Sequence, residues 1–281
     1  ADDRDVLPMS CDVPLDIPAP AGGVVRLPAV EVERRAAKIS CNISVKAPGI
    51  ELRSVRLCSV PSSVPLLAPD AAPSDNPDDY TDTPVRPLSG RQAAAEFFLL
   101  PNEQGTVTSI TDQRQKNAAN APRCASYLLI RAVRGGKVLA YTVYLGENNT
   151  SDFNVRANRH YRLDITLVDD NTADTRVSAY TAAVEDTFGR TQLGGYCYHA
   201  PSNRLTVTLT GDGHAPAVRG RLDVLEGDAA AFRVDGIAGP GHDLGSLRMG
   251  GSSRFPISYA PEIFTVGNSR LHYRVRLTDE Y

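Results

Sequence analysis

Apolar and polar residues alternate in the clearest segments of the chain, a period of two that is typical of half-buried β-strands. Two such segments flank residues 146–158, which are polar and rich in Gly and Asn, the residue types that favour turns. We therefore predict two strands joined by a loop, with Phe153 and Val155 holding the loop against the sheet. The apolar residues that share a face are Leu139, Tyr141, Val143 and Leu145 in the first strand and Tyr161, Leu163, Ile165 and Leu167 in the second.

The same reasoning predicts strands at 30–45, 52–60, 93–100 and 127–133. The residues KAPGIE at 46–51 are expected to turn the first of these strands back onto the second as a hairpin. Gly135 and Gly136 are expected to join the strand at 127–133 to the one beginning at Lys137, because paired glycines suit a tight hairpin turn. Residues 61–91 carry seven prolines, so we expect a long surface excursion there, and a second surface loop at 105–121.

The C-terminal part repeats this rhythm with shorter strands. After a strand near 176–184, the glycines within 187–199 indicate a linker. A strand at 203–210 then opens a series in which turn signals recur every 8 to 15 residues or so, as in a small β-sandwich. Its further members are predicted at 218–225, 231–234, 254–259, 263–266 and 270–278. The fold class is therefore all-β, with β-sandwich domains at 1–186 and 187–281, the second immunoglobulin-like.

Composition and charge exclude several classes of protein. The net charge is -3, and basic and acidic residues are interleaved, so there is no footprint for nucleic acid. No run of about 18 apolar residues is present, so we expect no membrane-spanning segment. The five cysteines form no CxxC pair. Cys41 and Cys58 fall on opposite faces of their strands, so we expect free, mostly buried thiols and no disulfide between these two residues.

No catalytic motif is present, so we predict no enzyme, no catalytic residue and no cofactor. Two histidines, His214 and His242, lie in glycine-rich segments beside an aspartate. Two such turns at one end of a sandwich would suit a shared metal ion, but surface histidines in turns are far commoner. We therefore expect no metal site.

Five segments together resemble the fimbrillin-like family, subunits of outer-surface fimbriae in Bacteroidales-type bacteria. They are LPMS (7–10), VERRAAKISCNISV (32–45), LRSVRLCSVP (52–61), FFLLPNEQG (97–105) and the loop that begins LGENNTSDFN (145–154). The resemblance covers about 160 residues and matches the second domain of that family, a transthyretin-like or Greek-key sandwich. Ala157 and Cys11 depart from the family pattern. The resemblance does not cover residues 203–281.

The resemblance implies an adhesive or structural subunit of a fimbrium at the cell surface and outer membrane, with other fimbrial subunits as partners. The additional C-terminal domain favours a tip or accessory position over the repeating stalk. Family members carry a further domain before LPMS and are made as lipoprotein precursors. The start ADDRDVLPMSC has no basic and apolar leader, so we expect a processed or shortened form with the leader absent. The alternative is a surface module that binds a glycan or host protein without polymerising.

Fimbrial subunits of this family assemble when a sandwich that lacks one strand accepts a strand from a neighbour. Two alternating segments are candidates for exchange: Val13, Leu15 and Ile17 near the N-terminus, and Leu271, Tyr273, Val275 and Leu277 near the C-terminus. Both are also compatible with ordinary closing strands. The polar loop offers a contact surface through Asn148, Asn149, Asp152 and Asn154, although its amides are also expected to bind local backbone groups.

Overall fold

The computed structural model describes residues 7–11, 13–14, 29–67, 72–187, 190–193, 196–199, 203–212, 215–259 and 271–279. Over these residues the protein consists of strands, with short 3-10 helices at η2 (Pro77–Asp79) and η3 (Gln113–Gln115), so the predicted all-β class is confirmed. Contacts divide the chain into unit 1 (Ala1–Gly135 and Leu139–Val177) and unit 2 (Gly136–Val138 and Ser178–Tyr281). The domain boundary predicted at residue 186 lies further along the chain than this division.

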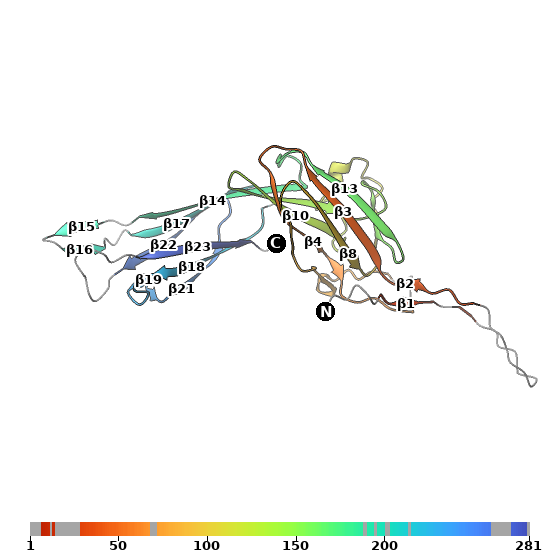
Figure 1. Ribbon diagram of the computed structural model, residues 1–281, viewed down its shortest axis with the longest axis horizontal. Coiled ribbons are helices and arrows are strands. Elements are labelled where there is room, and N and C mark those ends of the chain that lie inside the picture. The colour runs from red at the N-terminus through yellow and green to blue at the C-terminus, as the bar shows by residue number, and fades with distance from the viewer. Residues whose placement is uncertain are drawn as a thin grey trace, which may run out of the picture. The chain divides into compact units, whose positions relative to one another are not determined.

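One sheet of unit 1 has three strands in the order β13 (His160–Leu167), β3 (Ala37–Val45) and β8 (Gln92–Leu99) (Figure 1). The central strand, β3, pairs with β8 in antiparallel fashion and with β13 in parallel. Its inward side chains are almost fully buried, Ile39, Cys41 and Ile43 being at most 2% exposed. The predicted alternation on β3 and the strand at 93–100 are both confirmed, but β8 buries only the face of Ala95, Phe97 and Leu99 and is not the fully buried strand that the sequence indicates.

The second sheet of unit 1 contains β11 (Lys137–Tyr144), β10 (Tyr127–Arg134), β4 (Glu51–Cys58) and β7 (Arg86–Pro87), in that order. The turn between β10 and β11 has Gly135 and Gly136 at φ 53° and 81°, which confirms the predicted hairpin. The Arg86 guanidinium of β7 lies 4.5 Å from the ring centroid of Phe97 on β8, and so links the two sheets.

The predicted hairpin between the strands at 30–45 and 52–60 is wrong, because β3, which begins only at Ala37, and β4 belong to different sheets. Their connection holds Ala47 and Ile50, which are 5% and 1% exposed, whereas a turn at the surface would leave both in water. Burying these side chains favours a crossover from one sheet to the other. The crossover is fixed by Arg91, whose Nη2 donates to the carbonyl oxygens of Val45 and Lys46, both at 3.0 Å.

Both predicted surface loops of unit 1 are more ordered than the sequence indicates. Within 61–91, short pairings form in spite of the prolines, and within 105–121 the side chains of Ile110, Lys116 and Asn117 are buried. The short strands of unit 1 are β1 (Met9–Ser10), β2 (Glu33–Arg34), β5 (Val60–Pro61), β6 (Tyr80–Thr81), β9 (Asn102–Thr106) and β12 (Asp152–Val155). They pair as β1 with β2, β5 with β6, and β9 with β12.

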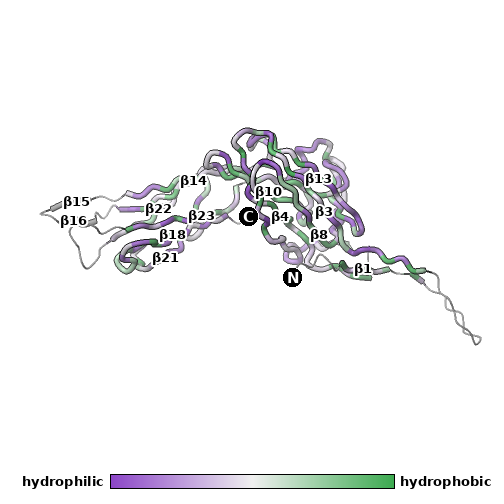
Figure 2. Tube along the Cα trace, in the orientation of Figure 1, coloured by the Kyte–Doolittle hydropathy of each residue, from purple (hydrophilic) through white to green (hydrophobic). Residues whose placement is uncertain are grey.

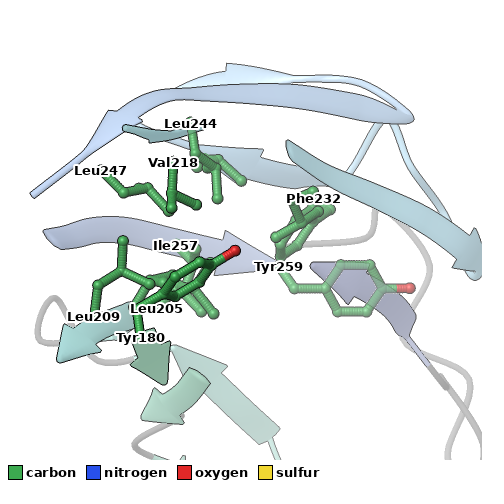
Figure 3. Close-up of a cluster of buried hydrophobic side chains, with 12 residues drawn as sticks. Tyr180, Leu205, Leu209, Val218, Phe232, Leu244, Leu247, Ile257 and Tyr259 are labelled. Atoms are coloured by element: carbon green, nitrogen blue, oxygen red, sulfur yellow. The ribbon is translucent and has the colours of Figure 1, made fainter. Parts of the chain in front are cut away.

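Unit 2 packs two sheets around one apolar core (Figure 3). One sheet holds β14 (Val177–Thr187), β17 (Arg204–Gly211), β22 (Gly251–Tyr259), β19 (Phe232–Val234) and β20 (Ile237–Ala238) in that order. The other holds β21 (Gly241–Leu247), β18 (Val218–Glu226) and β23 (His272–Asp279). Val218, Leu244 and Leu247 point across the core toward Leu205 and Leu209, as Figure 3 shows. The predicted inward row of Leu205, Val207 and Leu209 is fully buried.

Sequence and structure differ in the C-terminal part at two places, and a third prediction cannot be compared. The prediction of a linker at 187–199 is wrong, because β15 (Arg190–Leu193) and β16 (Tyr196–His199) pair as a hairpin. The strand β21 went unpredicted, since its glycines resemble turn residues. The strand predicted at 263–266 lies outside the described residues. The tube coloured by hydropathy in Figure 2 shows the same alternation of apolar and polar residues along β18 and β23.

Candidate functional site

A groove of about 810 Å³ on unit 1 runs along β13 and the C-terminal half of β11. Strand β13 lies at the edge of its sheet, so its outer backbone edge faces the groove rather than another strand of that sheet. The apolar residues that line the groove are Tyr141, Val143, Tyr144, Tyr161, Leu163, Ile165, Leu167 and Val177.

The apolar row of β13 is less well covered than the row beside it on β3. Leu163 and Ile165 remain half-buried, whereas Cys41 and Ile43, their register partners, are 1% and 2% exposed. The two rows face the same side of one sheet, because paired residues in adjacent strands point the same way. The groove is therefore a place where the sandwich leaves apolar surface open along a strand edge.

One end of the groove is fixed to the loop that follows β13. The hydroxyl of Tyr141 donates to the carbonyl oxygen of Asp169 at 2.8 Å, and Arg134 and Asp170 form an ion pair at 2.7 Å. Burial raises the pKa of the Tyr141 hydroxyl, and the neighbouring aspartates raise it further, so this donor stays protonated over the ordinary pH range.

The opposite end is held by Tyr161 and the polar loop at 146–158. The Tyr161 hydroxyl accepts a hydrogen bond from the Arg156 backbone N–H at 2.9 Å and donates to the Asn154 carbonyl at 3.3 Å. The Arg156 side chain forms ion pairs with Glu103 and Glu147 at 3.2 and 2.6 Å. Both ends of the groove are thus anchored, and the stretch between them over Leu163 and Ile165 is open.

Asp152 organises the polar loop. Its Oδ1 accepts the backbone N–H groups of Glu147 and Asn154 at 2.8 and 3.0 Å, and its Oδ2 accepts from Asn154 Nδ2 at 2.7 Å. Burial alone would raise the pKa of Asp152, but these hydrogen bonds outweigh it and the pKa is lowered. Gly146 packs closely against this hydrogen-bonded loop, since a Cβ there would come within 1.9 Å of the Asp152 carbonyl oxygen.

Lys116 supports the same loop from beneath. Its Nζ donates to the Asn148 carbonyl at 2.7 Å and lies 5.0 Å from the ring centroid of Phe153. Burial lowers the pKa of Lys116 to about 8, although the Asp152 carboxylate opposes the shift. The lysine therefore stabilises the polar loop from inside the wall of the groove.

The four residues predicted as a contact surface divide into two pairs. Asn148 and Asn149 are exposed, and Asn148 Oδ1 accepts from the backbone N–H of Asp152 at 3.0 Å. Asp152 and Asn154 are 8% and 7% exposed, and their polar atoms bind the loop itself. Only the first pair is exposed, while the second has the structural role that the sequence also allowed.

The predicted strand-exchange residues also fall in different surroundings. Val13 is 46% exposed, while Leu15 and Ile17 lie outside the described residues. The C-terminal row (Leu271, Tyr273, Val275 and Leu277) is partly buried against the core of unit 2.

Two hydrogen bonds tie β23 to β14. Tyr273 donates to Asp186 at 2.5 Å, and Tyr180 donates to Asp279 at 2.7 Å. A smaller hollow of about 400 Å³ lies beside this seam. The β23 row therefore closes the sandwich of its own unit.

In the part of the chain that the structure describes, no group of three or more His, Cys, Asp and Glu side chains could hold a metal ion. His242 is on β21 rather than in a surface turn. It is 6% exposed, its Nε2 lies 2.9 Å from the Gly239 carbonyl, and its ring packs edge-on against Phe232. His214 lies outside the described residues.

Four of the five cysteines agree with the prediction of free, mostly buried thiols, and the side chain of Cys197 lies outside the described residues. Cys11, Cys41, Cys58 and Cys124 are free, and all but Cys11 are buried. Burial raises the pKa of Cys58 to about 12, with Asp82 adding to the effect, so this thiol is unreactive at neutral pH. Among the described residues, no helix has the length and apolar character needed to cross a membrane.

Sequence reasoning identified the apolar row of β13 but assigned it no functional role. An edge strand and an interior strand show the same alternation, and only the register with β3 reveals that one side is open. Lys116 went unnoticed because a lysine in a polar segment gives no signal of burial. The glycine at 146 was identified, but its contact with Asp152 depends on the folded loop.

Part of the chain that forms this groove matches a known protein family. Residues 97–165 match the model of a domain of unknown function (DUF4906), a fimbrillin-associated family. The matched segment runs from β8 to β13 and contains two of the five resembling segments.

Among solved structures, the chain is similar to "the tip fimbrial protein Mfa3 from Porphyromonas gingivalis with C-terminal truncation", with 16% identity and a TM-score of 0.31. The similarity covers 53% of this chain and 51% of that chain, so it spans about half the length of each. A comparison with curated proteins gave no match.

Proposed function

We propose that this chain is a structural subunit of a cell-surface fimbria, and that it joins its neighbours by accepting a β-strand in the groove along β13. The observation that carries the proposal is the contrast between β3 and β13, whose side chains face the same way but are unequally covered. The match over residues 97–165 supports the fimbrial part, since the groove-forming β11 and β13 lie within it.

The physics of such an assembly is β-augmentation. An incoming strand would pair its backbone with the open edge of β13 and place alternate side chains over Leu163 and Ile165. About four inward apolar side chains at about 1.5–3 kcal/mol each give roughly 6–12 kcal/mol of gross burial. This equals most of the net stability of a domain, about 5–15 kcal/mol. A filled groove would therefore exchange its strand slowly.

The segment with Val13, Leu15 and Ile17 is the donor that we favour. Val13 is exposed, whereas the β23 row of Leu271, Tyr273, Val275 and Leu277 is already packed on its own core. Donating β23 would uncover that core, at a cost similar to what the new contact returns. The partners in this proposal are other fimbrial subunits, and the location is the cell surface and outer membrane. A tip or accessory position and a lipoprotein precursor remain part of the same proposal, which assigns no enzymatic activity.

A charge in the groove tests this assignment. Ile165→Asp places a carboxylate where the incoming strand would be, while Thr166→Asp places one on the exposed opposite face of the same strand. Light scattering after size-exclusion chromatography should show polymers for wild type and Thr166→Asp, and monomers for Ile165→Asp. Circular dichroism checks that both variants are folded. Polymers of normal length from folded Ile165→Asp would refute the groove as the acceptor.

The donor is tested with a synthetic peptide of residues 11–18, CDVPLDIP. The peptide should bind wild type and slow polymer growth, and a version with Val13, Leu15 and Ile17 changed to Ser should do neither. Binding of the original peptide to Ile165→Asp should be lost in parallel. Equal binding of both peptides would show that the alternating side chains are not what the groove recognises.

A further inference from the structure

The outward face of the three-stranded sheet in unit 2 carries a regular array of charges, which we call the arginine face. Strand register places three rows side by side, one residue from each of β21, β18 and β23. The rows are Ser246–Arg219–Thr278, Asp243–Arg221–Arg276 and Gly241–Asp223–Arg274. Neighbouring strands are about 4.8 Å apart and alternate residues about 6.8 Å apart, so the guanidinium groups form a closely spaced array.

These arginines keep most of their surface available. The side chains of Arg219, Arg221, Arg274 and Arg276 are 54–63% exposed, whereas that of Asp223 is 19% exposed. Asp223 lies 2.8, 3.8 and 3.2 Å from Arg221, Arg274 and Arg276, and Asp243 lies 3.4 Å from Arg219. Each guanidinium has five N–H donors, so these two carboxylates occupy only a minority of them.

The Arg221 guanidinium lies close to Gly241 of β21. A Cβ at Gly241 would come within 2.6 Å of Arg221 Nη2 and 3.6 Å of Asp223 Oδ1. The missing side chain at Gly241 therefore makes room for the planar group, and Asp223 Oδ1 holds its Nε at 2.8 Å. Arg221 first, and then Arg276 and Arg274, lower the pKa of Asp223, so the carboxylate is charged at neutral pH.

The array has an excess of positive charge. Four arginines face two aspartates, and Arg221 and Arg276 stand directly opposite each other in register. Like charges at directly opposed positions destabilise a sheet. Glu226, in register with His272, lies beyond one end of the array. An external anion between the guanidinium groups would relieve this repulsion.

We propose that the arginine face binds a polysaccharide that carries sulfate or carboxylate groups. Guanidinium groups recognise such anions through paired N–H donors. The aspartates between them, together with Ser246 and Thr278, accept hydrogen bonds from sugar hydroxyls. A polymer with both anionic groups and hydroxyls matches this mixture of donors and acceptors.

The same features argue against other polyanions. The three rows contain no aromatic side chain on which bases would stack, which single-stranded nucleic acid binding uses. They contain no apolar side chain to enter a lipid surface. The inference adds a ligand to the proposed fimbrial subunit but uses residues of unit 2 alone, so it does not depend on strand exchange.

The test uses the full chain and immobilised heparin, with unsulfated hyaluronan, dextran sulfate and neutral dextran as comparison probes. The double variant Arg221→Gln/Arg276→Gln should bind heparin at least tenfold more weakly. Its matched control, Arg204→Gln/Arg254→Gln, removes the same charge from the exposed face of the other sheet and should change affinity less than twofold. Hyaluronan and dextran sulfate show whether carboxylate or sulfate is preferred, and neutral dextran should not bind. An equal loss in both double variants would overturn the proposal.

The variant Asp223→Asn distinguishes two explanations of heparin binding, a site with oriented arginines and simple attraction between opposite charges. The substitution raises net charge, so attraction alone predicts tighter heparin binding, whereas loss of the group that orients Arg221 predicts at least threefold weaker binding. Tighter binding would overturn the site. Single-stranded DNA and phosphatidylserine vesicles should not compete for the two arginines, and competition at equal charge would overturn the assignment to a polysaccharide. Ile165→Asp should bind heparin normally, so a failure of assembly and a failure of glycan binding are distinguishable.

Discussion

Two edge strands, β13 in unit 1 and β23 in unit 2, carry the same alternation of apolar residues but have different surroundings. The row on β13 lines an open groove whose ends alone are anchored, by Tyr141 and Tyr161. The row on β23 covers the core of its unit, and hydroxyl–carboxylate bonds from Tyr273 and Tyr180 tie this side of the sandwich shut. The difference teaches that a strand edge is left open or closed by what covers it rather than by its own sequence.

The largest expected effect comes from Gly146→Ala, which would break the anchored end of the groove. The new Cβ would meet the Asp152 carbonyl oxygen at 1.9 Å, and backbone cannot move aside cheaply. We expect unit 1 to lose about 3 kcal/mol or more. Gly105→Ala is the control, since Gly105 also has positive φ but open space around it, and should cost about 1–2 kcal/mol. Urea denaturation compares the two, and equal losses would contradict the role of the contact.

The second effect concerns Lys116 and the pH. The unfolded chain holds the Lys116 proton up to about pH 10.5, while the folded chain releases it near pH 8. Between these values the unfolded state binds more protons, so the free energy of unfolding should rise with pH, by on the order of 1–3 kcal/mol. Lys116→Met should lack this rise. Urea denaturation of both proteins at pH 7.5 and 9.5 measures the difference, and parallel pH profiles would contradict the lowered pKa.

A smaller effect is expected at the closed edge. Tyr273→Phe removes the hydroxyl that donates to Asp186 and should lower the stability of unit 2 by about 1–2 kcal/mol. If this bond helps to keep β23 in place, limited proteolysis should also cut the variant faster near the C-terminus. Tyr161→Phe in unit 1 is the comparison, and it should leave the C-terminal cleavage rate unchanged. No change in either measurement for Tyr273→Phe would show that β23 needs no such closure.

The smallest effect separates neighbouring rows on one sheet. Ile165→Ala should cost less than about 1 kcal/mol of stability, because the side chain is only half-buried without a partner strand. Ile43→Ala, its register partner on β3, should cost about 2–5 kcal/mol. Thermal unfolding of monomeric protein compares the two. In assembled polymer the cost of Ile165→Ala should increase, and an equally small cost there would contradict burial by an incoming strand.

Short-range patterns made much of the fold predictable. The glycine pair before Lys137 specifies a tight turn, and the row of Leu205, Val207 and Leu209 can be buried only on one face. Contacts between segments far apart in the sequence could not be predicted from these local patterns. Ala47 and Ile50 look like turn residues until the second sheet is present to bury them, and Gly241 looks like a turn residue until Arg221 lies close to it. The open side of β13 is likewise a property of the missing neighbour, which no residue on β13 encodes.

In the proposed assembly, every subunit that donates a strand to its neighbour's β13 would bring an unfilled β13 groove of its own, so a growing polymer would always have one unfilled groove, at the same end. The resulting fibre would have a direction, with a growing tip unlike its base. To stop growth, the fibre would then need a last subunit whose β13 groove is already filled or that has no such groove.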